Sequence, residues 1–307
     1  MQGLVMKSTG SWYRVLGGDG VRRDCRLRGI HRLVRGAQTN PVAVGDYVRF
    51  TLESDGTGLI IAVEERRNCI VRKAASLSRL TQVLAANVDV LCIVASLPPP
   101  RTGTGFIDRL LATAEAHGIP SSLLFNKCDL HDASLLHEER RLRRIYRAAG
   151  YPVHVVSALR GDGLDRLRAL VSGRTVLFCG HSGVGKSALL NALDSSLCLR
   201  VGAVSCRSGQ GRHTTTCAEL LPFCGGYLID TPGVKEFGMA DISPRDLPHL
   251  FPEMRALLPR CRFSNCTHRR EPGCAVRAAV SQGIVSGERY HNYLGIMEGL
   301  GCGDVFV

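Results

Sequence analysis

The feature that most constrains the fold of this chain is the octapeptide GHSGVGKS at residues 180–187. It matches the phosphate-binding pattern G-x-x-x-x-G-K-[ST] at every fixed position. An apolar, strand-like run at 175–179 precedes it, and a helix-like run at 188–193 follows it. Glycines in such a loop let the backbone turn its N–H groups towards phosphate oxygens, and the helix adds its positive end. We therefore predict a nucleotide-binding α/β domain, the alternative being a glycine-rich turn that matches by chance.

Two side chains of this loop are predicted to have distinct tasks. The ammonium group of Lys186 would reach the outer phosphates and contribute to catalysis, and the hydroxyl of Ser187 would bind a magnesium ion. The other positions of the loop are expected to contact the nucleotide. The complete predicted phosphate-binding set is Gly180, His181, Ser182, Gly183, Val184, Gly185, Lys186 and Ser187.

A second motif lies upstream, where an apolar run leads into Asn126, Lys127, Cys128 and Asp129. These four residues form an N-K-x-D motif. A carboxylate at Asp129 can accept hydrogen bonds from the N1–H and the 2-amino group of guanine, and adenine offers neither donor there. Hydrogen bonds to a charged group contribute about 1.5–3 kcal/mol each, so these two bonds would strongly favour guanine over adenine. Asn126 and Lys127 are expected to brace the loop and pack on the base.

Three further motifs fit the same kind of site. Ser157 and Ala158 follow the next predicted strand, and the backbone N–H of Ala158 is expected at the guanine O6. A G-R-H-T-T-T segment at 211–216 reads as a mobile loop, in which we assign Thr215 to magnesium binding and catalysis. A D-T-P-G segment would hold magnesium through Asp230 and meet the γ-phosphate through the N–H of Gly233.

These are the parts of a GTPase in an unusual order. The usual chain runs P-loop, threonine loop, D-x-x-G, N-K-x-D and S-A. Here N-K-x-D and S-A come first, and the P-loop, the threonine loop and D-x-x-G follow. The sequence therefore predicts a circularly permuted P-loop domain over residues 69–240. The same site can form because the geometry of the motifs, rather than their chain order, builds it.

The N-terminal part, residues 1–68, is predicted to be a small β-barrel such as an OB-fold. Turn signals at 17–20 and 54–58 flank or separate short strand-like runs, and no long helical periodicity occurs. In the segment around Cys25 and Leu27, alternation would place these two side chains inward and the arginines outward. An arginine-rich face near Trp12 could bind RNA backbone and stack a base. The alternative is a solvated face on an ordinary barrel. The clustered arginines are Arg22, Arg23, Arg26, Arg28, Arg32 and Arg35.

The C-terminal part, residues 241–307, carries a compact set of metal-ligand residues. Cys261, Cys266, His268 and Cys274 supply three thiolates and one imidazole, which is a closed tetrahedral set for one structural zinc ion. The alternative is four reduced residues that are close by accident. Short helices are predicted at 275–281 and 288–300, with one apolar face of the second formed by Tyr290, Leu294 and Met297.

Charge and cysteine content limit the partners and the compartment. The formal net charge of +12 favours polyanionic partners, nucleic acid first, over the alternative of a merely basic soluble protein. Residues 1–10 lack the apolar segment of a signal peptide, and no run has the length that spans a membrane. We therefore expect a cytoplasmic protein with no membrane partner, whose 13 cysteines are reduced, buried or bound to metal.

Taken together, the N-K-x-D motif before a G-H-S-G-V-G-K-S loop, followed by G-R-H-T-T-T and D-T-P-G, resembles the RsgA (YjeQ) family of small ribosomal subunit biogenesis GTPases. The resemblance extends over nearly the whole chain. It implies a circularly permuted GTPase between an OB-fold and a mostly helical zinc domain. It also implies binding to the small (30S) ribosomal subunit and its rRNA late in maturation, with GTP hydrolysis stimulated by the subunit. We expect a monomer with GTP or GDP, one zinc ion and magnesium as cofactors.

One departure from the Ras-like pattern concerns catalysis. The residue after D-x-x-G is often a glutamine that orients the attacking water, but here it is Val234. His213 is the candidate within the chain for that task, and rRNA or a ribosomal protein could also help. The less favoured alternative is a loop histidine that faces solvent. Two other interpretations stay open. The chain could be a checkpoint module in which hydrolysis only triggers release, or a GTPase of transport or signalling.

Overall fold

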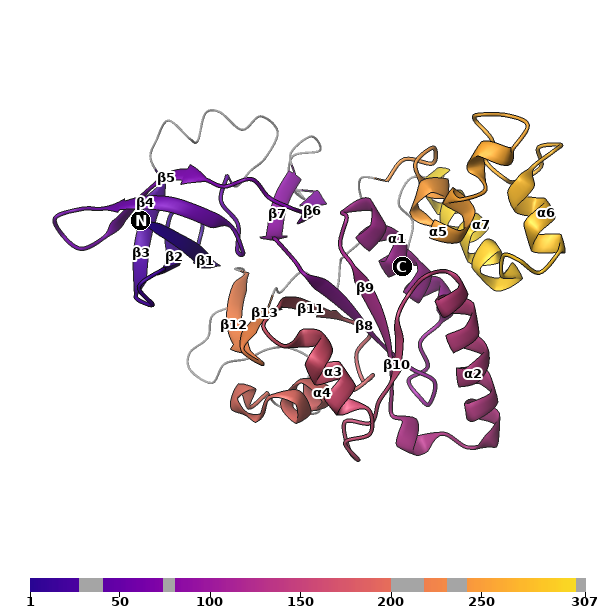
Figure 1. Ribbon diagram of the computed structural model, residues 1–307, viewed down its shortest axis with the longest axis horizontal. Coiled ribbons are helices and arrows are strands. Elements are labelled where there is room, and N and C mark those ends of the chain that lie inside the picture. The colour runs from indigo at the N-terminus through magenta and orange to yellow at the C-terminus, as the bar shows by residue number, and fades with distance from the viewer. Residues whose placement is uncertain (28–40, 74–80, 200–217, 231–241, 302–307) are drawn as a thin grey trace.

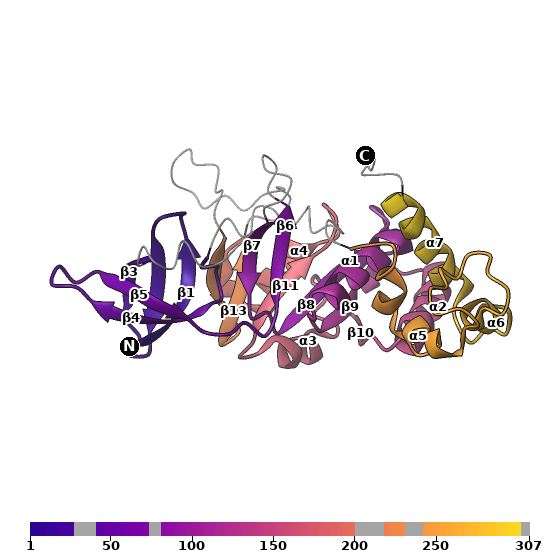
Figure 2. The same cartoon turned by 90° about the horizontal axis from the view of Figure 1, so that it is seen from above.

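The computed structural model describes residues 1–27, 41–73, 81–199, 218–230 and 242–301. Three bodies follow one another along its long axis: a β-barrel, a central sheet covered by helices, and a helical C-terminal domain (Figures 1 and 2). Among the helices that the structure describes, none combines the length and the apolar character needed to cross a membrane.

The first body is a closed five-stranded barrel. Its strands run in the order β1-β2-β3-β5-β4, and β4 pairs back onto β1. Cys25 and Leu27 point into the barrel, as the alternation predicts, while Arg26 is exposed. The barrel confirms the predicted OB-like architecture. The strands are β1 (Gln2–Ser8), β2 (Tyr13–Gly17), β3 (Arg22–Leu27), β4 (Tyr47–Leu52) and β5 (Gly58–Val63).

A two-stranded hairpin, which the sequence patterns did not single out, connects the barrel to the central body. It consists of β6 (Cys69–Lys73) and β7 (Thr81–Ala86). Val44 of the barrel forms a parallel bridge with Ala85 of β7, and Ala86 N–H donates to the Val44 carbonyl at 2.8 Å. The hairpin is therefore tied to the barrel by main-chain hydrogen bonds.

The central sheet places the predicted motifs at one edge. Its order is β10-β9-β8-β11-β13-β12, with β12 antiparallel to β13 and the other neighbours parallel. Because parallel strands all end at the same edge, the loops after them gather there, where open α/β sheets bind ligands. The strands are β8 (Val90–Ser96), β9 (Ser121–Asn126), β10 (Val153–Val155), β11 (Thr175–Cys179), β12 (Glu219–Phe223) and β13 (Gly226–Asp230).

Helices cover both faces of this sheet, which explains the continuous apolar run of β8. Ile93 packs in a cluster with α1 and α2, and its neighbour Cys92 packs on the other face with α3 and α4, because successive side chains of a strand point to opposite faces. Two 3₁₀ turns, η2 (Cys128–Leu130) and η3 (Ser195–Leu197), follow β9 and α4. The helices are α1 (Thr104–Ala116), α2 (Ala133–Ala148), α3 (Leu164–Val171) and α4 (Lys186–Leu193).

The barrel and the central body share one continuous sheet. Strand β1 of the barrel pairs antiparallel with β12, with Lys7 opposite Glu219, so that eleven strands form a single sheet. The Lys7 ammonium lies 2.8 Å from the Glu219 carboxylate across this junction. The contact between the two bodies therefore includes strand pairing as well as side-chain packing.

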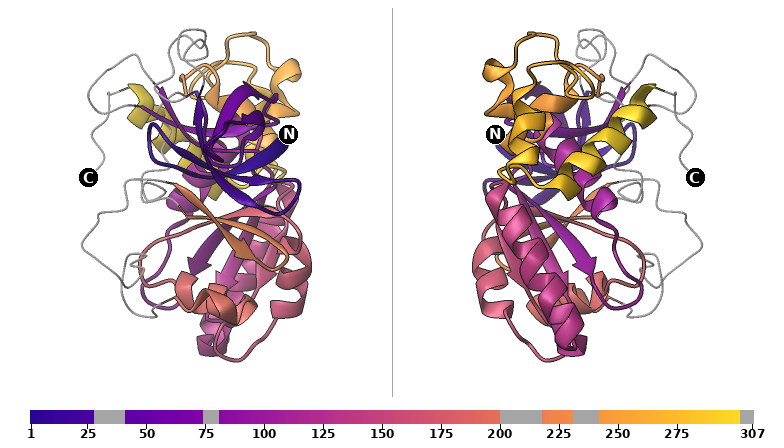
Figure 3. Two further views of the ribbon diagram at one scale, coloured as in Figure 1. Left: turned by 90° about the vertical axis from the view of Figure 1, so that its left-hand side faces the viewer. Right: turned by 90° about the vertical axis from the view of Figure 1, so that its right-hand side faces the viewer.

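The C-terminal domain lies beside α1 and α2, at the opposite end of the molecule from the barrel (Figures 1 and 3). A buried ion cluster holds it there. Arg289 of α7 donates to Asp108 of α1 at 2.6 Å and to Glu253 at 2.5 and 3.0 Å, and its side chain is only 2% exposed. The helical turns of this domain are η5 (Leu247–Leu250), α5 (Pro252–Arg255), η6 (Leu258–Arg260), α6 (Ala275–Ser281) and α7 (Gly287–Gly301).

The buried face of α7 includes the predicted residues, which pack on the core of the domain, but it is wider than predicted. Tyr290 and Leu294 are half-buried, and the fully buried positions are Arg289, Tyr293, Ile296 and Met297. The difference arises because α7 packs on α1 through Arg289. A prediction from the spacing of apolar residues places an arginine on the solvent side of the helix.

We expect Asp108→Asn to lower the free energy of unfolding by about 2 kcal/mol, since Arg289 would exchange a charged hydrogen-bond partner for a neutral one while buried. The Asn292 amide, which now donates to Asp108 at 2.6 Å, could turn round and accept, so the loss would be limited to the charge. Urea unfolding would measure this difference.

The matched control is Glu115→Gln, which removes a second ion pair between α1 and the C-terminal domain. In that pair, Arg255 lies 3.3 Å from Glu115, and both side chains are more exposed than those of Arg289 and Asp108. Its loss should therefore lower the free energy of unfolding by less than about 1 kcal/mol. Equal destabilisation by the two substitutions would contradict the importance assigned to the buried cluster.

Candidate nucleotide site and metal site

The phosphate loop connects β11 to α4 through backbone conformations that require glycine. Gly180 has φ +154° and Gly185 has φ +92°. A Cβ atom at Gly180 would lie 2.3 Å from the Val94 carbonyl oxygen, and one at Gly185 would lie 2.4 Å from the Asn126 amide nitrogen. The loop therefore packs directly against the end of β8 and against the N-K-x-D motif.

Lys186 lies at the first turn of α4 with its ammonium group folded over the loop. It donates to the carbonyl oxygens of Gly180 at 2.5 Å and His181 at 2.8 Å. These contacts keep the positive charge at the loop, where nucleotide phosphates would be its natural acceptors. Ser187 follows in the same turn, as the magnesium prediction requires.

His181 of the loop packs sideways onto α1. Its ring stacks on Phe106 with centroids 3.7 Å apart and an interplanar angle of 29°. Burial, together with the nearby Lys186 ammonium, lowers the pKa of His181 below its ordinary value. The side chain of His181 therefore contacts α1 and supports the loop from that side.

Asn126 connects three of the predicted motifs. Its amide nitrogen donates to the Val184 carbonyl of the phosphate loop at 2.9 Å, and its amide oxygen accepts from the Ala158 N–H at 3.2 Å. The residue is 1% exposed, so these bonds have little competition from water. The Ala158 N–H thus has a protein acceptor here, and its contact with the guanine O6 stays a prediction.

Asp129, the residue predicted to recognise guanine, has one carboxylate oxygen fixed by the protein. The Ser157 hydroxyl donates to Asp129 Oδ1 at 2.5 Å and itself accepts from the Arg160 N–H at 3.0 Å. Lys127 adopts φ +65° and donates through its ammonium to the Pro99 carbonyl at 3.2 Å. Cys128 lies between them, half-buried. The structure therefore brings N-K-x-D, S-A and the phosphate loop together at one edge of the sheet.

Two described residues fit the predicted magnesium site by their position and their chemistry. Asp230 is the last residue of β13, and β13 is the parallel neighbour of β11, so Asp230 and Ser187 lie at the same sheet edge. A carboxylate and a hydroxyl are hard oxygen donors of the kind that Mg²⁺ prefers. The other residues predicted for this part of the site, His213, Thr215 and Gly233, lie outside the described residues, as do Val234 and the arginines from Arg28 to Arg35.

We expect Ser157→Ala to weaken GTP and GDP binding about tenfold, because the Asp129 carboxylate would lose the charge-assisted hydrogen bond that orients it. Titration with a fluorescent guanine nucleotide would measure the affinity. Replacing the exposed Ser172 with alanine serves as the control and should change nothing. Unaltered nucleotide affinity in Ser157→Ala would show that Asp129 is oriented by other means.

The metal-ligand residues of the C-terminal domain come together as predicted. The ligand atoms of Cys261, Cys266, His268 and Cys274 all lie within 4.8 Å of one another. His268 Nδ1 is 3.3 Å from Cys274 Sγ and 3.7 Å from Cys261 Sγ. Three sulfurs and one imidazole nitrogen at this spacing fit tetrahedral zinc, with Nδ1 as the imidazole ligand.

Hydrogen bonds hold the loops of this cluster in shape. Tyr290 and Tyr293 donate from α7 to the carbonyls of His268 and Thr267 at 2.6 and 2.8 Å. Burial raises the pKa of the Cys266 thiol to about 12. A bound divalent cation would oppose that effect, since it deprotonates the thiols that coordinate it. The donor set and its support would suit a structural metal ion.

Phosphate and guanine motifs on this sheet, in this chain order, define a circularly permuted P-loop GTPase with a barrel before it and a Cys₃His cluster after it. The family model of the RsgA GTPase matches residues 63–240, and that of the RsgA N-terminal domain matches residues 2–60. The chain therefore belongs to the RsgA GTPase family, as its motifs suggest.

Individual relatives agree with this assignment over the whole length. The "Small ribosomal subunit biogenesis GTPase RsgA" of Bacteroides fragilis is 46% identical, with 97% of this chain and 96% of the relative covered. That of Flavobacterium johnsoniae is 43% identical, with 97% and 93% covered. Among solved structures, YjeQ from Thermotoga maritima is 34% identical with a TM-score of 0.81, and 99% of each chain is covered. YloQ, described as a circularly permuted GTPase, is 30% identical with a TM-score of 0.78, covering 100% of this chain and 96% of YloQ.

Proposed function

We propose that this GTPase binds the small ribosomal subunit, assists its late maturation, and hydrolyses GTP to GDP and phosphate faster when the subunit is bound. The observation that carries the nucleotide assignment is the Ser157–Asp129 hydrogen bond beside the Asn126 bridge to the phosphate loop. It leaves an oriented carboxylate for guanine next to a phosphate cradle. The names of full-length relatives supply the ribosomal part of the proposal.

The proposed division of work follows the positions of the side chains. Asp129 would select guanine, and Lys186 would turn from the loop carbonyls to the phosphates. Ser187 and Asp230 would hold Mg²⁺, which neutralises charge on phosphate oxygens when it is bound. Thr215 and the Gly233 N–H would complete the phosphate contacts, and His213 would orient the attacking water in place of the glutamine that Val234 replaces.

Contacts with ribosomal RNA are proposed for the two outer domains. The barrel exposes basic side chains beside Trp12, and the metal-binding loops carry Arg262, Arg269 and Arg270, all exposed. Basic and aromatic groups on one surface suit RNA, because they can contact phosphates and stack with bases.

We propose domains at 1–68, 69–240 and 241–307, a cytoplasmic monomer, and one structural zinc ion.

GTP and ATP hydrolysis, each measured with and without purified small subunits, tests the proposal. We expect slow turnover of GTP alone, strong stimulation by the subunit, and little hydrolysis of ATP in either case. Absence of any stimulation would contradict the ribosomal role. Equal turnover of ATP would contradict the assignment of Asp129.

A second function is favoured by the missing glutamine after D-x-x-G. In this second function, the protein acts by remaining bound to the subunit, and GTP hydrolysis only triggers its release from the subunit. Lys186→Ala distinguishes the two, because it removes the phosphate-binding charge. A Lys186→Ala protein that still supports subunit maturation would favour the checkpoint function.

We expect His213→Ala to reduce subunit-stimulated turnover about 100-fold or more if His213 positions the attacking water. GTP binding should be unaffected, since the imidazole would act on water rather than on the nucleotide. Single-turnover hydrolysis on saturating subunits measures the effect. Unchanged stimulated turnover would remove His213 from the mechanism.

A further inference from the structure

A continuous row of charged side chains crosses the junction between the barrel and the central sheet. Successive cross-strand partners are Asp24 on β3, Arg14 on β2, Lys7 on β1, Glu219 on β12 and Asp230 on β13. Residues directly opposite each other in neighbouring strands project to the same face, about 5 Å apart at Cβ. The row therefore runs without interruption from the barrel to the aspartate predicted to hold magnesium.

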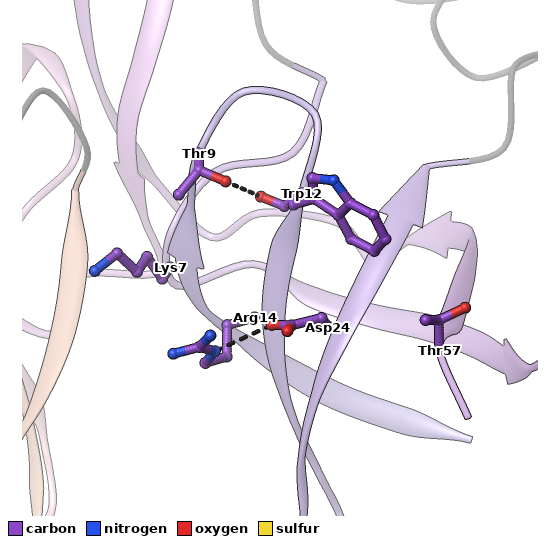
Figure 4. A pocket seen from close by; sticks show the side chains of 6 residues that line it. All are labelled: Lys7, Thr9, Trp12, Arg14, Asp24 and Thr57. Atoms are coloured by element: carbon purple, nitrogen blue, oxygen red, sulfur yellow. Dashed lines mark hydrogen bonds and ion pairs between the residues drawn. The ribbon is translucent and has the colours of Figure 1, made fainter. Parts of the chain in front are cut away.

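The barrel end of this row lies in a hollow of about 400 Å³ (Figure 4). The single tryptophan of the chain, Trp12, is one of its lining residues, and the Arg26 guanidinium lies over the indole ring at 4.0 Å. The Thr9 hydroxyl donates to the Trp12 carbonyl at 3.1 Å and closes the turn that carries it. The residues lining the hollow are Lys7, Thr9, Trp12, Arg14, Asp24 and Thr57.

The chemistry of the hollow suits one unstacked nucleotide of RNA. An indole and a guanidinium plane are both surfaces on which a base stacks. Arg14 and Lys7 offer cationic groups for the adjoining phosphates, and Asp24 offers an acceptor for a base amino group. A hollow of about 400 Å³ is large enough for a base and its sugar.

Both cations of the hollow are held by ion pairs that a phosphate could replace. Arg14 lies 3.1 Å from Asp24, and both side chains are about half exposed. Lys7 lies 2.8 Å from Glu219, and both of these side chains are about one-third exposed. Exposed pairs contribute little to stability, so exchange of the partner carboxylate for a phosphodiester is feasible. In Figure 4 the Lys7 side chain extends away from Arg14 and Asp24, towards the strand that carries Glu219.

If Lys7 exchanged Glu219 for an RNA phosphate, the electrostatic potential near Asp230, at the other end of the row, would change. Glu219 is the direct cross-strand partner of Asp230. Once Lys7 turns to a phosphate, the negative charge of Glu219 is no longer neutralised and favours a divalent cation beside Asp230. If a phosphodiester at Lys7 raises the affinity for Mg²⁺ and nucleotide, then Mg²⁺ and nucleotide must raise the affinity for the phosphodiester by the same factor, because the coupling between two sites is reciprocal.

We propose that the Trp12 hollow is a binding site for a single-stranded RNA nucleotide, and that the Lys7–Glu219 pair couples its occupancy to magnesium–nucleotide binding. The proposal rests on the proposed function, which supplies GTP and an RNA contact at the barrel, and it adds the position of the nucleotide and its coupling to the GTPase site. It assigns Lys7 and Glu219 as positioning residues that act through Asp230.

Fluorescence of Trp12 in the full-length protein tests both parts, with single-stranded dodecauridylate RNA as the probe. We expect RNA to quench the emission and to bind about fivefold more tightly with saturating Mg²⁺ and a non-hydrolysable GTP analogue than without nucleotide. Glu219→Gln should keep the quenching but lose the nucleotide dependence. Lys7→Met should weaken RNA binding and also lose the dependence.

The matched control is Glu64→Gln, which breaks an exposed ion pair elsewhere on the barrel. That pair joins Arg49 of β4 to Glu64, the residue after β5, at 3.1 Å. The Glu64→Gln protein should retain both the quenching and the fivefold dependence. Absence of quenching in the wild-type protein would overturn the binding site. A dependence that persists in Glu219→Gln would overturn the coupling. Stimulated GTP hydrolysis on the same preparations reports on the proposed function separately, because it can persist when either result is negative.

Discussion

Replacing Asp129 with asparagine is expected to lower the affinity for GTP by about 100-fold or more and to make xanthosine triphosphate the better ligand. Two hydrogen bonds from guanine to the carboxylate, at about 1.5–3 kcal/mol each, account for a loss of this size. Xanthine carries a carbonyl in place of the 2-amino group, so an amide N–H₂ at position 129 would match it.

The surroundings of Asp129 favour this exchange of specificity. The Ser157 hydroxyl donates to Asp129 Oδ1 and would hold the amide oxygen of an asparagine in the same place. The amide nitrogen would then face the base. Competition between GTP and xanthosine triphosphate for a fluorescent nucleotide measures the preference.

Asp132→Asn is the matched control for this substitution. Asp132 caps the start of α2 by accepting from the Leu135 N–H and lies three residues beyond Asp129. Its replacement should leave the nucleotide preference as it is. An Asp129→Asn protein that still prefers GTP would contradict the proposed guanine contact.

Removing zinc is expected to unfold the C-terminal domain. Structural zinc contributes about 10–16 kcal/mol to the folding of small domains. The buried side chains around the cluster, such as Phe251, Met254 and Tyr293, form only a small core of their own. Titration with a thiol-reactive mercurial should release one zinc ion per chain and abolish part of the helical circular dichroism.

Cys266→Ser should behave like the zinc-free protein, because a buried hydroxyl is a poor replacement for a thiolate ligand. Cys198→Ser, which alters an exposed cysteine outside the cluster, should bind zinc normally. A metal-free protein that keeps its full helical signal and its thermal transition would show that the cluster is not needed for folding.

Much of the nucleotide site was predictable because its information is local. A strand, a glycine-rich loop and a helix follow one another in sequence around Lys186, and the observed bounds of β11 agree with the predicted run. The same holds for the N-K-x-D motif at the end of β9. Once such motifs end neighbouring parallel strands, the sheet itself brings them together.

The features that the sequence did not reveal are contacts between distant segments. The pairing of β1 with β12 joins Lys7 to Glu219 across 212 positions of the chain, and no periodicity marks it. Arg289 reads as a surface residue, since an arginine is buried only when partners are supplied. Its partners Asp108 and Glu253 come from other segments, so sequence pattern alone could not place it inside.

The proposed function and the proposed coupling together imply that the nucleotide held by the permuted domain controls binding to the small ribosomal subunit. Sedimentation of the full-length protein with purified small subunits, saturated with GDP or with a non-hydrolysable GTP analogue, tests it most directly. We predict at least about fivefold tighter binding in the GTP-like state. Equal affinity in the two states would contradict the claim.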